Sequence, residues 1–332
     1  MLIDTRLAER LKKINPSSTL AITAKAKKLK SQGQDVITLA AGEPDFDTPE
    51  FVKNSAIEAI KSGFTKYTPS TGTPELKKII SERFQKDNHL DYTWEQIVVS
   101  CGAKHSIYNA LMVLVNKHDE VILASPYWVS YPEMVNLCDG IARFVDTKPE
   151  NDFKITADGL KRLISKKTKV LILNSPSNPA GSVYDEKELV EIAKICVKHK
   201  IFVISDEIYE KIIFDGRRHI SIGSLDNNIR DLTITVNGLS KSYSMTGWRV
   251  GYLGAPLYIA EAIAKLQDHS TSNPNSIAQK AALTALQSDD SFPKQMCLEF
   301  EKRRDYLVSR LKGNPKIKYV LPRGAFYMFC DI

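Results

Sequence analysis

Short apolar runs alternate with helical periodicity through the middle of this chain. Between two of these runs, apolar residues recur at three- and four-residue steps from Leu189 to Val197, which predicts a helix with one buried face. Asp185 and Glu188 have the spacing of a capping box at its start. Repetition of strand, helix and strand predicts an α/β fold, a mostly parallel sheet with helices on both faces. The runs that are suited to buried strands are 121–124, 170–173, 202–205 and 233–236.

The two ends of the chain have a different pattern, and 332 residues exceed what one hydrophobic core usually serves. An amphipathic stretch precedes an extended Gly-Glu-Pro-Asp segment near residue 45. We therefore expect a large domain at 46–290 and a smaller domain built from 1–45 together with 291–332. After residue 290 the pattern predicts a charged helix at 299–311, a turn at 313–315, and strand-like runs around Tyr319 and at 326–329.

Composition excludes several classes of function. The net charge of +7 (46 basic minus 39 acidic residues) is scattered, and its longest basic clusters, at 25–30 and 166–169, are short, which argues against a nucleic-acid partner. No apolar run has the length of a membrane span, and residues 1–14 lack the apolar core of a secretory signal. Five widely spaced cysteines and six histidines show no metal-binding spacing. We expect a cytoplasmic protein with reduced thiols and no metal.

Unusual polar residues follow three of the predicted strands. In an open parallel sheet, ligands bind just beyond the carboxyl ends of the strands. A fourth segment, 100–104, opens a predicted helix with small residues, which leaves backbone N–H groups free for a phosphate. An amine, a carboxylate and phosphate donors are the parts that a pyridoxal 5′-phosphate (PLP) site needs. The residues at the strand ends are Asn174, Asn178, Asp206, Tyr209, Ser240, Lys241 and Arg249.

Each of these residues taken alone has another interpretation. Lys241 alone is a surface lysine, and Asp206 alone is a helix cap. Asn178 before a proline is more often a turn, and Trp128 more often packs in a core. Their occurrence together at one sheet edge favours a site.

Six motifs in order resemble those of class I aminotransferases, and they are most similar to the bacterial aspartate aminotransferases. The resemblance extends from about residue 10 to residue 330, and six ordered motifs are far more specific than one. The motifs are Ala41–Phe46, Lys66–Pro69, Ser125–Trp128, Asn174–Gly181, Ser205–Tyr209 and Ser240–Arg249.

The resemblance implies a PLP-dependent transferase fold and a role for each matching residue. Lys241 would form the Schiff base with PLP and carry the substrate proton, while Asp206 would hold the pyridine nitrogen protonated. Asn178 and Tyr209 would hydrogen-bond the phenolic oxygen of the ring, and Trp128 would stack on its face. Lys241, Asp206 and Tyr209 form the expected catalytic set.

The remaining matches concern the phosphate, the substrate and a second subunit. Tyr67 would reach the phosphate from a neighbouring subunit, which implies a homodimer. Gly42 would offer a backbone contact to the substrate carboxylate, beside Trp128 and Asn178. The phosphate would be held by Gly102, Ala103, Lys104, Ser240 and Arg249.

The implied activity is transfer of an amino group from an L-amino acid to a 2-oxo acid, with aspartate and 2-oxoglutarate as the favoured pair. Specificity for aromatic substrates or prephenate stays open, because the contacts to a distal substrate carboxylate are hard to assign to Thr19 or Lys104. The side chain of Lys104 is an alternative partner for that carboxylate. The sequence is also compatible with a PLP-dependent lyase on the same fold and, less well, with a non-catalytic regulator.

The end of the sequence departs from the family pattern. Related chains continue beyond the segment that matches Gly324–Tyr327 and supply there an arginine for the substrate carboxylate. Because this sequence ends at Ile332, we expect an incomplete small domain and weak turnover. We also expect Arg323 to be a solvated charge, and apolar surface to be exposed around Phe326, Tyr327 and Phe329.

Overall fold

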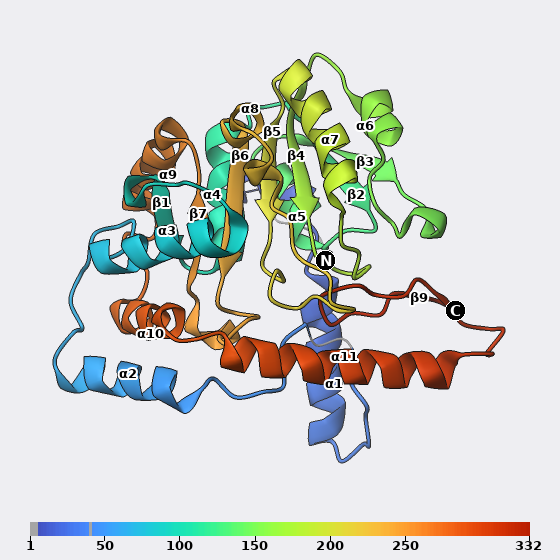
Figure 1. The fold of residues 1–332 in the computed structure, drawn as a ribbon, viewed down its shortest axis with the longest axis horizontal. Helices are drawn as coiled ribbons and strands as arrows, with labels where there is room; N and C mark the ends of the chain where they lie inside the picture. The colour runs from blue at the N-terminus through green and yellow to red at the C-terminus, as the bar shows by residue number, and fades with distance from the viewer. Residues whose placement is uncertain (1–5, 40–41) are drawn as a thin grey trace.

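The computed structural model describes residues 6–39 and 42–332, and within these ranges seven strands form one sheet in the order β1-β7-β6-β5-β4-β2-β3 (Figure 1). Strand β7 runs antiparallel to β1 and β6, and the remaining neighbours are parallel. The four predicted strands and the α/β fold class are confirmed. The strands are β1 Ile97–Ser100, β2 Glu120–Ser125, β3 Ile141–Asp146, β4 Thr168–Asn174, β5 Phe202–Asp206, β6 Thr233–Gly238 and β7 Gly251–Gly254.

Helices cover both faces of the sheet, because successive residues of a strand point to opposite faces. Val170 and Ile172 of β4 pack with one helical layer, whereas Leu171 and Leu173 pack with the other. The first layer consists of α4 Ala103–Leu114, α5 Ser130–Leu137 and α9 Leu257–Ser270. The second consists of α6 Ala157–Leu163, α7 Glu186–His199 and α8 Asn227–Arg230.

Helix α7 begins at the predicted capping box. The Asp185 carboxylate accepts the N–H of Glu188 at 2.9 Å, and the Glu188 carboxylate accepts the N–H of Asp185 at 2.8 Å. Leu189, Ile192 and Cys196 form the buried face that the periodicity predicts. Helix α4 likewise buries its predicted apolar residues, Ile107, Ala110, Leu111 and Leu114.

A further group of helices packs around the β1 edge and below the sheet (Figure 1). None of the helices within 6–39 and 42–332 is long and apolar enough to cross a membrane. The α-helices of this group and of the chain ends are α1 Ser18–Ser31, α2 Glu50–Lys61, α3 Pro74–Asn88, α10 Ser276–Gln287 and α11 Ser291–Leu311. Short 3₁₀ turns occur at Glu9–Lys13, Trp94–Gln96, Pro149–Asn151, Ile222–Ser224 and Thr246–Trp248.

Helix α11 runs across the carboxyl-terminal side of the sheet (Figure 1) and joins the chain end to it. It begins at Ser291, earlier than the predicted 299, and Met296 and Phe300 pack with Ile208, Tyr209, Ile212, Phe214 and Ala325. The division into a domain at 46–290 and a second at 1–45 plus 291–332 stays a prediction, and residues 1–5 and 40–41 of it lie outside the described residues.

The predicted strand at 326–329 is wrong. The strand pair at the chain end is β8 Lys318–Tyr319 with β9 Cys330–Asp331. Phe326 and Tyr327 are instead drawn inward by aromatic contacts, since Phe326 lies 5.2 Å from the Phe300 ring. Both rings are therefore partly buried, which corrects the expectation of exposure, whereas Phe329 is 38% exposed.

Candidate active site

Lys241 lies in the loop after β6, and its side chain is surrounded by residues from other segments of the chain. Its ammonium donates a hydrogen bond to the carbonyl of Gly42. It also lies 5.8 Å from the centre of the Tyr209 ring and 5.6 Å from that of Phe326. The pKa of Lys241 is lowered to about 8, chiefly by burial and also by the positive charge of Arg249, while the negative charge of Glu43 opposes the shift. A lysine in this environment releases its proton near neutral pH.

Asp206 ends β5 and is buried, with 4% of its surface exposed. Its Oδ2 accepts the hydroxyl of Tyr131 at 2.6 Å, and its Oδ1 accepts the N–H of Ile208 at 3.2 Å. Burial raises the pKa of Asp206 to about 6, while the Tyr131 hydrogen bond acts to lower it. The carboxylate is thus poised close to its titration point, where one added cation decides its charge.

A group of hydroxyls and amides surrounds the next part of the site. Tyr209 and Tyr327 share a hydrogen bond of 2.6 Å between their hydroxyls. The Asn178 side chain also bonds Tyr209, yet burial raises the pKa of Tyr209 well above its ordinary value and keeps it protonated. Asn174 fixes this loop, because its amide accepts the N–H of Asn178 at 2.7 Å and donates to the carbonyl of Asp206 at 2.9 Å.

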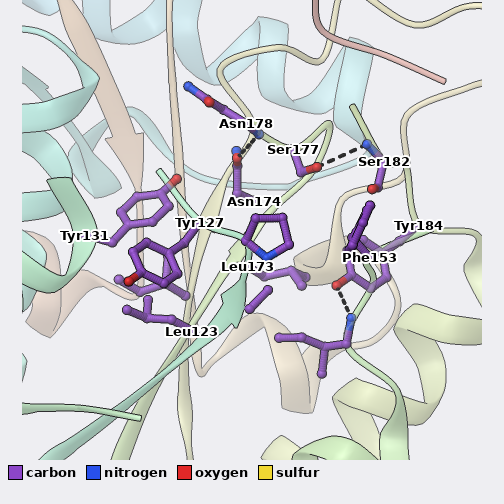
Figure 2. A pocket seen from close by; sticks show the side chains of 14 residues that line it. Leu123, Tyr127, Tyr131, Phe153, Leu173, Asn174, Ser177, Asn178, Ser182 and Tyr184 are labelled. Atoms are coloured by element: carbon purple, nitrogen blue, oxygen red, sulfur yellow. Dashed lines mark hydrogen bonds between the residues drawn. The ribbon is translucent and has the colours of Figure 1, made fainter. Parts of the chain in front are cut away.

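Figure 2 shows a pocket beside this loop, lined by Asn174 and Asn178 together with Tyr127 and Tyr131, which come from α5 and the segment before it. The pocket adjoins the hydrogen-bonding groups around Asp206. It therefore belongs to the same site.

A second group of polar residues lies at the amino end of α4. Gly102 caps the helix with φ of 94°, a conformation that favours glycine, and the guanidinium of Arg249 lies against it. The first N–H groups of a helix, here those of Ala103 and Lys104, have no partner within the helix and attract anions. Buried Ser240 lies in the loop that leads to Lys241.

Lys104 adds a cation at the amino end of α4. Its ammonium lies 4.8 Å from the centre of the Trp128 ring, and burial together with Arg249 lowers the pKa of Lys104. Trp128 packs edge-on against Tyr131. The site thus combines a cationic end, an aromatic wall and a buried carboxylate.

Of the remaining predicted site residues, Gly42 lies at the site and Tyr67 lies on the surface. Gly42 lies at the site, since a Cβ there would come within 2.9 Å of the Tyr327 hydroxyl and its carbonyl holds Lys241. Ala41, which opens the first motif, lies outside the described residues. Tyr67 is 91% exposed on the surface of the single chain.

Comparison with known proteins decides the family. Residues 34–332 match the family described as aminotransferase class I and II. The chain belongs to the class I and II aminotransferase family. It is 48% identical to the aspartate aminotransferase of Bacillus sp. (strain YM-2) over 326 residues, covering 98% of this chain and 83% of that protein. It is 46% identical to the aspartate aminotransferase of Bacillus subtilis (strain 168), covering 98% of this chain and 82% of that protein.

Solved aminotransferase structures have the same fold. The aspartate aminotransferase of Thermus thermophilus with maleate superimposes with a TM-score of 0.95 at 41% identity, covering 98% of this chain and 85% of that chain. The Rhizobium meliloti aspartate aminotransferase also has a TM-score of 0.95 and 41% identity, covering 98% of this chain and 82% of that chain. This protein is therefore a PLP-dependent aminotransferase that acts on amino acids and 2-oxo acids.

Several residues of this aminotransferase site were not expected from the sequence. Tyr131 bonds Asp206, and Tyr327 bonds Tyr209. Tyr131 follows Trp128 by three residues, so it lies one helical turn beyond a predicted site residue. That spacing was the local signal, but its partner is 75 positions away in sequence.

Arg323 is not the solvated charge that we expected in this aminotransferase. It donates to Asp215 at 2.9 Å, and Arg304 of α11 donates to both oxygens of the same carboxylate at 2.8 Å. Hydrogen bonds from Arg304, and then from Arg323, lower the pKa of Asp215 to about 2. The pair fastens the 215 loop and the chain end to α11.

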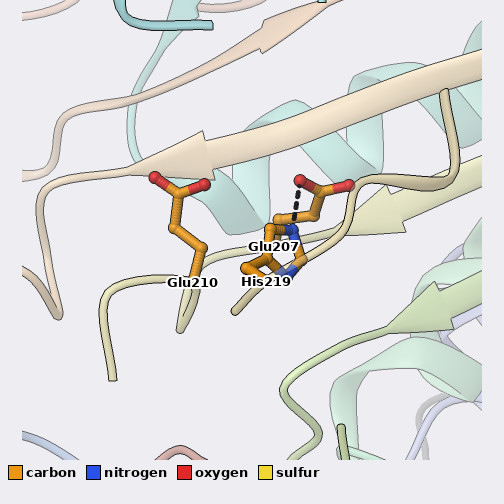
Figure 3. A group of neighbouring side chains, drawn as sticks. All are labelled: Glu207, Glu210 and His219. Atoms are coloured by element: carbon orange, nitrogen blue, oxygen red, sulfur yellow. Dashed lines mark hydrogen bonds and ion pairs between the residues drawn. The ribbon is translucent and has the colours of Figure 1, made fainter. Parts of the chain in front are cut away.

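The Glu207 side chain lies beside His219, with Glu210 nearby (Figure 3). Its side chain is fully buried, and its carboxylate accepts 2.7 Å hydrogen bonds from Ser205, Ser221 and His219. Such donors satisfy a buried carboxylate. The adjacent acids Asp206 and Glu207 of the aminotransferase therefore have separate hydrogen-bond partners.

Proposed function

We propose that this protein transfers the amino group of L-aspartate to 2-oxoglutarate, with PLP carried by Lys241. The observation that carries the proposal is the convergence of a buried lysine of lowered pKa, a buried aspartate and the amino end of α4 in one site. The relatives named aspartate aminotransferase support the choice of substrate.

The donor set fits PLP. PLP supplies an electron sink, so that the amino acid loses its α-proton once its amine is joined to the cofactor. A phosphate dianion suits the amino end of α4, because helix N–H groups and two cations gather there. The residues that would hold it are Gly102, Ala103, Lys104, Ser240 and Arg249. The buried Asp206 carboxylate suits a protonated ring nitrogen, since a cation beside it favours its ionised form.

Lys241 is the group that we assign to proton transfer. With a pKa of about 8, roughly a tenth of its amine is neutral at pH 7, compared with far less than a hundredth at the ordinary value of 10.5. A neutral Nζ attacks an aldehyde and accepts a proton. Burial of Lys241 therefore serves both tasks.

Asn178 and Tyr209 orient the cofactor ring in this proposal. Both carry donors, and Tyr209 stays protonated because burial raises its pKa. They fit an ionised phenolic oxygen, which accepts hydrogen bonds. Trp128 forms the wall against which the ring stacks.

Substrate carboxylates meet two places in the site. The backbone of Gly42, which contacts Lys241, would meet one of them together with Trp128 and Asn178. The ammonium of Lys104 over Trp128 suits the distal carboxylate of a dicarboxylic acid. The Thermus thermophilus relative was solved with maleate, a dicarboxylate of four carbons.

We further propose a homodimer in which Tyr67 reaches the phosphate site of the partner. Its 91% exposure in the single chain supports this, because a cross-subunit residue must project from its own subunit. Free cysteines agree with a reducing cytoplasmic location, which stays a prediction.

The test is the absorbance spectrum of the protein with PLP, before and after addition of L-aspartate. Conversion of the cofactor to its amine form, with one oxaloacetate per site, supports the proposal. Lys241→Ala is the control that removes the essential amine. An unchanged spectrum with aspartate but conversion with an aromatic amino acid would move the assignment to the second candidate.

That second candidate is specificity for prephenate or aromatic substrates. It is favoured by the relative of Aquifex aeolicus (strain VF5), which is named a probable aspartate/prephenate aminotransferase and is 45% identical. A lyase would instead release pyruvate and ammonia from a single amino acid. Product analysis therefore separates the three activities.

A further inference from the structure

Tyr131 contacts two residues that we place on different sides of the cofactor ring. Its hydroxyl donates to Oδ2 of Asp206 at 2.6 Å. Its ring packs edge-on against Trp128, with ring centres 5.2 Å apart and planes at 87°. Tyr131 is the second residue of α5 and is 3% exposed. The first turn of α5 therefore ties the carboxylate to the aromatic wall.

The length and burial of this hydrogen bond make it a strong one. A separation of 2.6 Å is typical of a hydroxyl that donates to a carboxylate, and such bonds are about twice as strong as neutral ones. Burial and the negative charge of Asp206 raise the pKa of Tyr131 well above its ordinary value. The phenol therefore stays protonated and always donates.

The hydrogen bonds of Asp206 also fix its orientation. The Ile208 N–H binds Oδ1 and the Tyr131 hydroxyl binds Oδ2, so each oxygen has one donor and one direction left for another. We propose that Tyr131 is a positioning residue for amino transfer, which holds Asp206 ionised and aligned toward the ring nitrogen of the cofactor. This inference rests on the proposed function.

Other charged groups near Asp206 do not replace Tyr131. Lys241, from the loop after β6, lowers the pKa of Asp206, but its amine gains and loses its charge during the proposed reaction. Glu207, next along the chain, raises that pKa. Tyr209 and Tyr327 face the same site as neutral hydroxyls that bond each other. Tyr131 is thus a steady donor at a carboxylate that burial would otherwise neutralise.

The test compares Tyr131→Phe with Tyr127→Phe. Both remove one phenol hydroxyl from the same segment, but the Tyr127 ring stacks on Phe144 instead of bonding Asp206. In the apoprotein, the Asp206 carboxyl is titrated by carbon-13 NMR and assigned with Asp206→Asn. We expect its midpoint to rise by about one to two pH units in Tyr131→Phe, the equivalent of one charged hydrogen bond, and to stay unchanged in Tyr127→Phe.

A second measurement follows PLP binding and turnover in the same variants. We expect Tyr131→Phe to bind PLP about tenfold to a hundredfold more weakly, and to lower kcat with little change in KM for aspartate. An Asp206 midpoint that is unchanged in Tyr131→Phe overturns the inference, even if the variant is less stable. If the unaltered protein binds no PLP, the proposed function fails, and the apoprotein titration still decides the role of Tyr131.

Discussion

Replacement of Gly251 by alanine tests how closely the proposed phosphate-binding group at the amino end of α4 depends on backbone packing. Gly251 begins β7, and a Cβ there would come within 2.5 Å of the Gly102 carbonyl carbon and 2.8 Å of the Ala103 Cα. Its nearest contact would be the Ala103 nitrogen, a group that we assign to the phosphate. All three atoms are backbone, so no side chain can rotate away.

The size of the expected effect follows from this geometry. An ordinary contact for a Cβ begins at 3.4 Å, so the start of α4 must move by roughly 1 Å. Overpacking of this kind costs about 1–3 kcal/mol of folding free energy. A displacement of about 1 Å at a positioning group costs on the order of a hundredfold in rate. We therefore expect Gly251→Ala to weaken PLP binding by at least tenfold.

The assay is fluorescence titration of the apoprotein with PLP, together with urea unfolding. Gly247→Ala is the matched control, because a Cβ at Gly247 has no heavy atom within 4 Å and the residue lies in the same segment. We expect wild-type PLP affinity in the control. Wild-type affinity and stability in Gly251→Ala as well would refute the argument that α4 and β7 touch through backbone alone.

Three further predictions concern charges. Lys104→Gln should raise KM for aspartate about tenfold or more, with a much smaller effect for an aromatic donor, as steady-state kinetics on both would report. Asp215→Asn should lower the free energy of unfolding at pH 7: a pKa lowered from 3.8 to about 2 corresponds to roughly 2.4 kcal/mol, and exposure reduces this to about 1 kcal/mol. Because the pKa of Asp215 is lower in the folded state than in the unfolded state, this stabilisation is present above about pH 4 and disappears as the pH falls toward 2. A difference in unfolding free energy between wild type and Asp215→Asn that stays constant with pH would contradict the prediction. Lys241→Arg should abolish amino transfer while the fold persists, since guanidinium stays protonated at neutral pH, and circular dichroism beside product assay checks both.

Local patterns account for much of the fold. The runs at 170–173 and 202–205 became buried strands, and Asp185 with Glu188 closed the predicted capping box, because each depends on neighbours a few residues away. Positions at strand ends also predicted that Asp206 and Lys241 share a site, since parallel strands end at one edge.

The errors occurred where distant segments meet. The segment at 326–329 has a strand-like composition, but contacts with Phe300 and Tyr209 turn Phe326 and Tyr327 inward. Arg323 has no nearby acid in sequence, and its partner Asp215 lies 108 positions earlier. No local pattern carries this information.

The sequence by itself determined the alternation of elements, the parallel sheet, the family and the chemical groups of the site. Only the tertiary structure decided how those groups are tuned and held. The lowered pKa of Lys241 comes from burial beside Gly42, Tyr209 and Phe326. The Asp206 carboxylate accepts a hydrogen bond from Tyr131, which lies on another element. Gly251 is a glycine because the backbone of α4 lies against it. Periodicity records which face of an element is buried, whereas desolvation and close backbone contact depend on which other elements cover that face.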